Sequence, residues 1–325
     1  MVESPRAVFI SWFTFHGRSD GIARILGIRG WFSDGGRGPT ALREIRRWRQ
    51  TSRLLKTERP DAVIVMQPPV IALWCVCRYA RKTPIRIAGD LHTGVFDEPG
   101  NRLAMRHTMR LLRRHGLAIV TNEALARIAA SEGCRALVLH DLIEVCDRDM
   151  TRPGNPVLSG LAEGTYVLVP LAYAYDEPID ELIAAAKVTP DLRWVFTGRP
   201  PRKVGSTAPA NVSFPGYVSN EDFLRALSQA GVVVAMTKNE NTMQRAAYEA
   251  LCYGRPLVTA DTEVLSDYYG GAAEVVAPRG NDIAAGVRRA LADDDASERM
   301  AELRTRRIAE QKRALGLLRE WLVSG

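Results

Sequence analysis

Residues Gln244 to Val258, QRAAYEALCYGRPLV, follow an apolar run, Gly231 to Met236, that predicts a buried strand. The quoted stretch predicts a helix that ends near Gly254, because glycine is a common C-cap and a proline two residues later cannot continue a helix. A second strand is expected at Leu257 to Ala260. A strand, a helix and a strand in this order are typical of a parallel α/β sheet.

Two charges within this helix indicate nucleotide chemistry. Arg245 and Glu249 are four residues apart, so they lie one turn apart on the same helix face. A carboxylate just inside a helix that follows a polar loop, here Thr237 to Met243, can accept hydrogen bonds from both hydroxyls of a ribose. The N–H groups at a helix N-terminus attract phosphates. The alternative interpretation is a surface ion pair in an ordinary α/β unit.

The stretch resembles the donor-binding motif of GT-B glycosyltransferases, especially of the large family 4 of mostly retaining enzymes. That motif has a Glu, seven residues, and then Glu-Ala-Leu or Glu-Ala-Met, a small residue and Gly-x-Pro-Val. The resemblance implies that Glu249 holds the nucleotide ribose. Asn241 stands where the motif has an acid that touches the donor sugar, and a one-residue shift of the loop would bring Glu240 to that place.

The rest of the C-terminal half predicts further strands and helices in alternation. Strands are expected at 166–171, 194–196 and 212–214, and helices at 176–186 and 220–230. The order resembles the second Rossmann-like domain of GT-B enzymes, which implies that Gly198 faces the diphosphate and that the Tyr217–Val218 backbone lies beside the base. A basic pair that is usual after the first strand is replaced here by Ala-Tyr-Ala-Tyr. Basic residues that could neutralise the diphosphate instead, or equally be solvated surface charges, are Arg199, Arg202, Lys203, Lys238 and Arg245.

Length and composition favour two domains. The chain has 325 residues, 46% of them hydrophobic and 25% charged, and single cores seldom grow beyond roughly 250–300 residues. We expect two Rossmann-like domains facing each other across a cleft, residues 1–155 on the acceptor side and residues 156–305 for the nucleotide sugar. A linker is expected at 151–160, where Arg-Pro-Gly-Asn-Pro breaks regular structure. The GT-B resemblance implies that a terminal helix, 306–325, crosses back to the first domain.

The N-terminal half has its own α/β pattern. Strands are expected at 7–13, 62–66, 85–88, 117–121 and 136–139. Gly17 follows the first strand closely and would let a ligand approach the backbone at the carboxyl edge of the sheet. The stretch 60–142 resembles lipid-linked β-mannosyltransferases of the chitobiosyl-diphosphodolichol type. The shared features are a Pro-Pro turn after Gln67, Asp90-x-His92 and a strand end at Thr121-Asn122-Glu123.

Asp90 and His92 are the candidate catalytic residues. They alternate by two at an expected strand end, so both side chains would project near one site. An inverting transfer needs a base that deprotonates the acceptor hydroxyl, and an Asp or His with a pKa near the working pH suits that role. In retaining family 4 enzymes, the resemblance implies instead a His that contacts the donor sugar. A hydrogen bond within a loop is the other interpretation of His92, and His16 has the next-best position among the histidines.

Basic residues are concentrated in the first half of the chain. Residues 1–152 contain 25 Lys and Arg against 15 Asp and Glu, whereas the remainder has 19 against 22. Two segments with helical spacing, 41–56 and 102–115, interleave basic and apolar residues. Such helices are typical of surfaces that bind anionic membranes, and the alternative is a domain helix with an apolar face in the core. No aromatic stacking module or zinc finger indicates nucleic-acid binding.

These resemblances imply a cytoplasmic glycosyltransferase of the hexosyl type, peripheral on the inner membrane face and independent of metal. It would move a sugar from a UDP- or GDP-sugar to a glycan or a polyprenyl-diphosphate-linked acceptor in cell-surface polysaccharide synthesis. No cofactor is expected besides the nucleotide sugar as co-substrate. The five cysteines predict reduced, buried thiols, and no signal peptide is expected. A sugar-nucleotide epimerase of the same fold and a non-catalytic nucleotide- or membrane-binding homologue are the alternatives.

Overall fold

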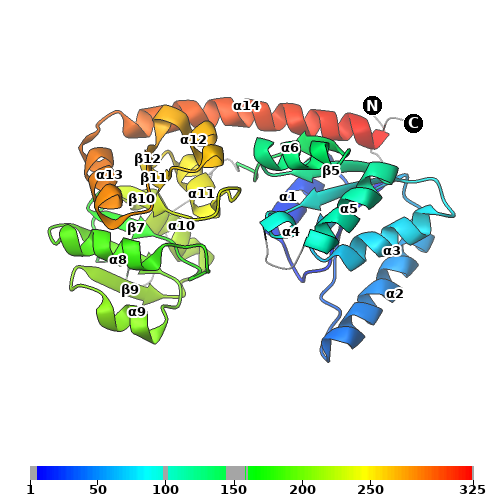
Figure 1. The fold of residues 1–325 in the computed structure, drawn as a ribbon, viewed down its shortest axis with the longest axis horizontal. Helices are drawn as coiled ribbons and strands as arrows, with labels where there is room; N and C mark the ends of the chain where they lie inside the picture. The colour runs from blue at the N-terminus through cyan, green and yellow to red at the C-terminus, as the bar shows by residue number, and fades with distance from the viewer. Residues whose placement is uncertain (1–5, 98–101, 144–157, 159, 324–325) are drawn as a thin grey trace. The chain divides into compact units, whose positions relative to one another are not determined.

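The computed structural model describes residues 6–97, 102–143, 158 and 160–323. The chain divides into two compact units (Figure 1). The first unit comprises Met1–Leu142 with Glu310–Gly325, and the second comprises Ile143–Ala309. Each unit is built on one six-stranded sheet. The expected linker at 151–160 lies almost entirely outside the described residues.

The first sheet is parallel, with the strand order β2-β1-β3-β4-β5-β6. Its strands are β1 (Ala7–Ser11), β2 (Arg29–Phe32), β3 (Ala62–Gln67), β4 (Arg86–Leu91), β5 (Gly116–Val120) and β6 (Arg135–Val138). Every residue of β1 and β3 is buried. Buried apolar strands of this kind are typical of parallel sheets whose two faces are both covered by helices.

Helices cover both faces of the first sheet. On one face lie α2 (Thr40–Glu58), α3 (Val70–Ala80), the short α4 (Gly94–Asp97), α5 (Arg102–His115) and α6 (Glu123–Ser131). On the other face lie α1 (Gly17–Leu26) and the last turns of α14 (Ala296–Val323). Because successive strand residues point to opposite faces, Val8 and Ile10 join the first core, whereas Ala7 and Phe9 join the second.

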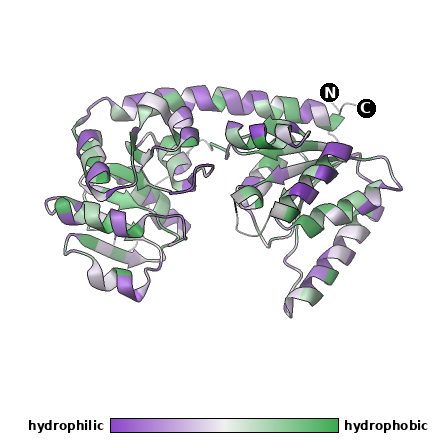
Figure 2. Cartoon of the chain, viewed as in Figure 1, coloured by the Kyte–Doolittle hydropathy of each residue, from purple (hydrophilic) through white to green (hydrophobic). Residues whose placement is uncertain are grey.

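The second sheet is also parallel, with the order β12-β11-β10-β7-β8-β9. Its strands are β7 (Tyr166–Val169), β8 (Arg193–Thr197), β9 (Val212–Gly216), β10 (Val232–Ala235), β11 (Leu257–Ala260) and β12 (Glu274–Val276). The helices of this unit are α8 (Ile179–Val188), α9 (Arg202–Thr207), α10 (Asn220–Gln229), α11 (Arg245–Tyr253), α12 (Glu263–Tyr269) and α13 (Gly280–Ala292). Figure 2 shows hydrophobic residues concentrated in the strands of both sheets.

The strand, helix and strand expected from the opening stretch are confirmed as β10, α11 and β11. Gly254 caps α11 with a φ of 61°, a left-handed conformation that glycine adopts without steric cost. The expectation for β4 was wrong at its end: the strand continues through Asp90 to Leu91, although Gly and Asp are poor strand formers. Pairing with β3 and β5 on either side, where Asp90 opposes Met66 and Ile119, overrides that local preference.

Three further features differ from, or add to, the sequence expectations. The edge strand β2 was not expected, and neither was the short helix α9. The C-terminal segment is one helix, α14, whose Leu315, Leu318 and Leu322 belong to the core of the first unit. Across the described ranges, no helix combines the length and hydropathy that a bilayer crossing requires.

Candidate functional site

Polar side chains gather at the edge of the first sheet where its parallel strands end. His16 follows β1 as the N-cap of α1, and His92 comes directly after β4. His140 and Asp141 lie beyond β6. Because the carboxyl ends of parallel strands meet at one edge, residues distant in sequence become neighbours there.

The centre of this edge is an ion pair between Arg18 and Asp90. The Arg18 guanidinium donates to Asp90 Oδ1 from Nε (3.1 Å) and from Nη2 (3.0 Å). It also donates to the carbonyl oxygens of Leu139 (2.7 Å) and His140 (2.8 Å) and to Asp141 Oδ1 (3.1 Å). All five of its N–H groups therefore have an acceptor. Arg18 was not predicted from the sequence, where its position in the first turn after β1 was the only signal.

Burial changes the role expected for Asp90. Its side chain has no exposed surface, and that of Arg18 is 4% exposed. Burial alone would raise the pKa of Asp90, but the Arg18 guanidinium and the His92 ring outweigh burial and hold that pKa well below its usual range. A carboxylate that is buried, paired and ionised is poorly placed to deprotonate an acceptor hydroxyl. Its contacts fit a positioning residue, and a catalytic role for Asp90 stays a prediction.

His92 is a partly exposed member of the cluster. Its side chain is 24% exposed, and its buried Nε2 lies 3.5 Å from Asp90 Oδ2, a charge contact that is too long for a hydrogen bond. Its backbone N–H donates to the Gln67 carbonyl oxygen at the end of β3 (3.2 Å). A carboxylate behind one ring nitrogen orients the imidazole and favours a proton on that nitrogen.

The His16 ring lies against the His92 ring, with centroids 4.9 Å apart in an edge-to-face arrangement. His16 Nδ1 accepts a hydrogen bond from the backbone N–H of Ser19 (3.4 Å) and so caps α1. Burial, followed by the nearby His92, lowers the pKa of His16. The structure thus brings His16 and His92 together, with His16 favoured as a neutral ring. Gly17, which separates His16 from Arg18, is the first residue of α1.

In the second unit, Glu249 lies on the first turns of α11, beyond the carboxyl end of β10. Arg245 Nε donates to Glu249 Oε1 over 2.9 Å. The Glu249 side chain is 18% exposed, whereas that of Arg245 is 72% exposed. Neighbouring residues Ala247, Ala250 and Leu251 are buried in the unit, which fixes the face that α11 turns outward.

In the loop before α11, the Glu240 carboxylate contacts the start of the next helix, and its role toward the donor sugar stays a prediction. Glu240 Oε1 accepts a hydrogen bond from the backbone N–H of Glu263 (2.6 Å), at the start of α12. The Asn241 backbone N–H donates to Asn239 Oδ1 (3.4 Å). The loop is also held at its beginning, where Thr237 Oγ1 donates to Asp176 Oδ2 (2.7 Å). These contacts place Glu240 beside α12.

The remaining predicted donor residues lie together at the ends of β8 and β9. Gly198 has a φ of 89°, and a Cβ there would lie 2.2 Å from the Leu171 carbonyl oxygen, so only glycine fits. The Arg199 guanidinium stands 5.9 Å from the centroid of the Tyr217 ring. Tyr217 is 77% exposed, whereas Val218 is buried.

A carboxylate that was not predicted stabilises the turn after β7. Glu177 accepts hydrogen bonds from the backbone N–H groups of Ala172 (3.1 Å) and Ala174 (2.8 Å). Burial raises the pKa of Glu177. Since β7 lies between β8 and β10 in the sheet, this turn separates Gly198 from the loop before α11. An acid therefore shapes the Ala-Tyr-Ala-Tyr turn where the GT-B resemblance has a basic pair.

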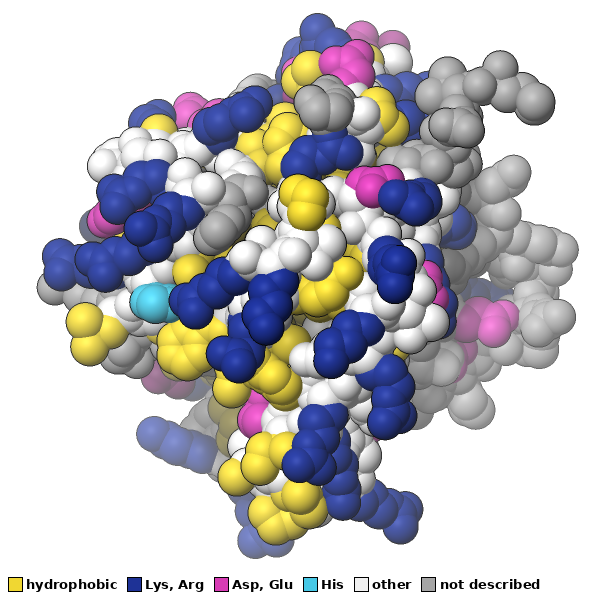
Figure 3. All heavy atoms as spheres, turned by 90° about the vertical axis from the view of Figure 1, so that its right-hand side faces the viewer, with side chains coloured by type: hydrophobic (Ala, Val, Ile, Leu, Met, Phe, Trp, Pro, Cys, Tyr) yellow, Lys and Arg dark blue, Asp and Glu magenta, His cyan; other side chains and the backbone are white. Residues whose placement is uncertain are grey.

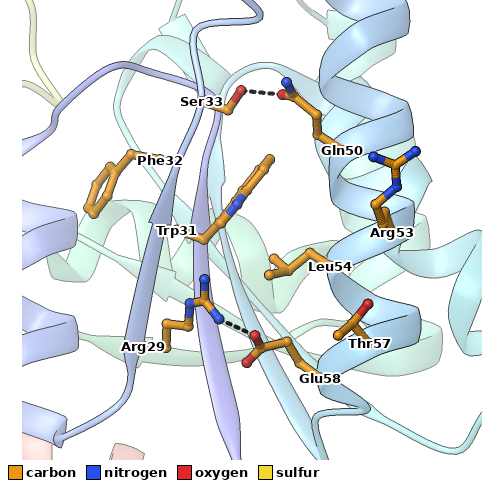
Figure 4. A pocket seen from close by; sticks show the side chains of 9 residues that line it. All are labelled: Arg29, Trp31, Phe32, Ser33, Gln50, Arg53, Leu54, Thr57 and Glu58. Atoms are coloured by element: carbon orange, nitrogen blue, oxygen red, sulfur yellow. Dashed lines mark hydrogen bonds and ion pairs between the residues drawn. The ribbon is translucent and has the colours of Figure 1, made fainter.

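A surface pocket of about 460 Å³ lies elsewhere, between β2 and α2 (Figure 4). The Trp31 side chain points into it from β2, and Leu54 and Arg53 line it from α2. Ser33 Oγ donates to Gln50 Oε1 (2.7 Å) at one end, and Arg29 pairs with Glu58 at the other. No predicted site residue lines this pocket.

Comparison with known proteins gives a family similarity for part of the chain. Residues 179–316 match the model of a family described as "Glycosyl transferase-like". The match covers less than half of the chain and includes Glu249 and the other residues predicted to bind the donor, apart from Gly17. No curated protein matches the sequence significantly.

Solved structures resemble the whole chain. Sucrose-phosphate synthase from Thermosynechococcus elongatus has a TM-score of 0.72 at 13% identity, covering 96% of each chain. Anabaena HepE in complex with UDP and glucose has a TM-score of 0.70 at 13% identity, covering 98% of this chain and 92% of that one. UDP-GlcNAc 2-epimerase from Neisseria meningitidis bound to UDP-GlcNAc has a TM-score of 0.60 at 13% identity, covering 98% and 91%. These likenesses confirm the predicted fold, two Rossmann-like domains of the GT-B type.

Proposed function

We propose that this chain is a glycosyltransferase that moves a sugar from a nucleotide sugar to a saccharide or lipid-linked acceptor. The observation that carries the proposal is Glu249, a partly covered carboxylate on α11 beside the carboxyl end of β10. It lies inside the segment that matches the glycosyl transferase-like family. A carboxylate at this place suits the two hydroxyls of a ribose.

The other groups at this edge would complete a nucleotide site. The backbone at Gly198 would face a diphosphate, and the exposed Arg199 and Arg245 bring positive charge to the same edge. The backbone of Tyr217 and Val218 would lie beside the base. The structure of HepE with UDP and glucose supports a UDP-sugar over a GDP-sugar as the first donor to test.

In the first unit, His92 is the residue that we expect to contact substrate. Asp90 would orient the ring, and Arg18 would keep Asp90 ionised. If the transfer inverts, His92 would take the proton of the acceptor hydroxyl. If the transfer retains, His92 would contact the donor sugar. The partly exposed ring is compatible with either role.

The acceptor that we favour is a polyprenyl-diphosphate-linked saccharide in cell-surface polysaccharide synthesis, met on the cytoplasmic side of a membrane. The similarity of residues 60–142 to lipid-linked β-mannosyltransferases and the basic helices of the first unit support this choice. We also expect a transfer that needs no metal, because arginine side chains would meet the charge of the diphosphate. Activity that disappears with EDTA and returns with Mg²⁺ would refute that expectation.

The test is calorimetric titration of UDP, GDP and ADP into the wild type and into E249A. We expect one nucleotide to bind and E249A to lose about 1.5–3 kcal/mol, the usual value for hydrogen bonds to a charged group. E274A is the matched control, because Glu274 is also an ion-paired carboxylate of the same unit, with Arg289 at 2.8 Å. If no nucleotide binds, or if E274A weakens binding as much as E249A does, the proposal is wrong.

An epimerase remains the second candidate, since the Neisseria UDP-GlcNAc 2-epimerase shares the fold. The two functions differ in what they need. An epimerase converts its nucleotide sugar without an acceptor, whereas a transferase releases nucleotide only when an acceptor accompanies the donor, apart from slow hydrolysis. Incubating the protein with the nucleotide sugar alone and following the sugar by NMR separates them. A non-catalytic homologue would bind the nucleotide and show neither reaction.

A further inference from the structure

Three neighbouring helices give the first unit a strongly basic face. α3 contacts both α2 and α5, and the three helices pack on the same side of the sheet. α2 contains six Lys and Arg residues and α5 contains five, whereas the only acids in the three helices are Glu44 and Glu58. Figure 3, which views the molecule from the side of α2 and α3, shows Lys and Arg spread over this surface with hydrophobic side chains between them.

Several of these cations have no partner among the residues that the structure describes. Within the described ranges, the following side chains form no hydrogen bond or ion pair: Arg49, Arg53, Arg106, Arg110 and Arg114. These guanidinium groups, two on α2 and three on α5, repel one another, and this repulsion is relieved when an anionic partner binds.

Apolar side chains are exposed on the same helices. Leu42 and Ile45 on α2 are 42% and 49% exposed, Trp74 on α3 is 41% exposed, and Leu103 on α5 is 79% exposed. A helix that only packs its apolar face into the core of a domain would not expose these side chains. That description holds for the second half of α2, where Leu54 and Leu55 are buried, but no residue from 40 to 50 is buried.

We propose that the face formed by α2, α3 and α5 binds the surface of an anionic lipid bilayer. The arginines would neutralise lipid headgroups, and Leu42, Ile45, Trp74 and Leu103 would enter the interface between headgroups and acyl chains. A nucleic acid would satisfy the arginines but would leave the aliphatic residues in water, which is why we favour lipid. This inference rests on the proposed function, because a lipid-linked acceptor would require the protein to approach a membrane.

The experiment is co-sedimentation of the full chain with vesicles of phosphatidylcholine alone and of phosphatidylcholine mixed with phosphatidylglycerol. We expect binding to the mixed vesicles and little to the neutral ones. R49Q/R106Q/R110Q should weaken binding at low salt by about fivefold for each arginine, on the order of a hundredfold together. The control R306Q/K312Q/R313Q removes three exposed cations from one helix, α14, and should bind as the wild type does.

The apolar contribution is tested at high salt, which screens the charges. Wild type should retain part of its binding there. L42S/I45S/L103S should lose that remainder while keeping the binding at low salt. I25S/V188S/L317S is the control, since its three positions are exposed by 42%, 52% and 57%. Equal loss in the control would show a general effect of surface hydrophobicity and would overturn the proposal.

Two other outcomes would also overturn the proposal. One is equal affinity for neutral and anionic vesicles, and the other is tight binding of RNA or DNA without binding of vesicles. UDP titration in the absence of vesicles keeps this test separate from that of the proposed function. A protein that binds UDP but not anionic vesicles lacks the lipid surface and retains the nucleotide site. A protein that binds anionic vesicles but no nucleotide has the lipid surface and lacks the nucleotide site.

Discussion

Each of the two parallel sheets has an arginine–carboxylate ion pair at its carboxyl edge, but the two pairs differ in how far their side chains are exposed to solvent. Arg18 and Asp90 in the first unit are buried, with exposures of 4% and 0%. Arg245 in the second unit is 72% exposed, and its partner Glu249 is 18% exposed. A buried pair must satisfy its hydrogen bonds inside the protein, so it holds its neighbours in place. An exposed pair can exchange its contacts with those of a ligand.

This difference has energetic consequences. Removing one partner of a buried ion pair leaves an uncompensated charge and costs about 3–5 kcal/mol. An exposed pair at i and i+4 on a helix contributes only about 0.3–0.5 kcal/mol. We therefore expect the first pair to support the architecture of the site and the second to take part in the proposed nucleotide binding. Mutations that break each pair test this assignment.

The largest effect is expected from R18M in the first unit. Methionine keeps much of the side-chain volume but leaves Asp90 buried without its cation, so unfolding of this unit should require about 3–5 kcal/mol less free energy. Urea unfolding followed by circular dichroism measures the change. R6M is the control, because Arg6 also pairs with an aspartate of the unit, Asp61, but at the surface. A loss for R18M no larger than that for R6M would contradict the assignment.

A second effect, which depends on pH, is expected from the Asp90 carboxyl. Its pKa in the folded protein lies below the value of about 3.9 for an unfolded aspartate. The stability from its ionised form is therefore present above about pH 4 and is lost as the pH falls toward the folded pKa. D90N should be less stable than wild type at neutral pH, and the difference should shrink as the pH falls below about 4. Urea unfolding at several pH values measures this, and a difference that stays constant would contradict the pairing.

The same contrast explains what could be predicted from the sequence. The α11 region was predictable because its signals are local: an apolar run for β10, a four-residue spacing on the helix, and a glycine and a proline where α11 ends. Arg18 was missed because its partner Asp90 lies 72 residues away. The ends of β1 and β4 come together only when the parallel sheet forms, and no spacing in the sequence indicates that they will be neighbours.

Neighbouring contacts also decide where predicted residues face. The Glu240 carboxylate accepts a hydrogen bond from the N–H of Glu263, 23 residues later, a contact that the local sequence does not indicate. Asp90 was expected near a strand end, but pairing on both sides draws it into β4. In both cases the residue type was informative, whereas its surroundings depended on elements that meet only in the folded chain.

The smallest effect on stability is expected from R245A. The exposed pair with Glu249 contributes about 0.3–0.5 kcal/mol to folding at most, so the urea midpoint should hardly change. Binding should change instead. If Arg245 meets the diphosphate, R245A weakens UDP and leaves uridine, which has the ribose but no phosphate, nearly unaffected. E249A should weaken both, because both carry the ribose hydroxyls.

The two variants therefore separate the two ends of the nucleotide, and calorimetric titration measures each. R289A is the control, since Arg289 is a 55% exposed partner of Glu274 in the same unit. If R245A weakens uridine as much as UDP, Arg245 acts only by orienting Glu249, and the positive charge for the diphosphate must come from Arg199 or another cation of that edge. If R245A instead lowers the unfolding free energy as strongly as R18M does, the exposed pair is architectural too, and the contrast between the two sheets is wrong.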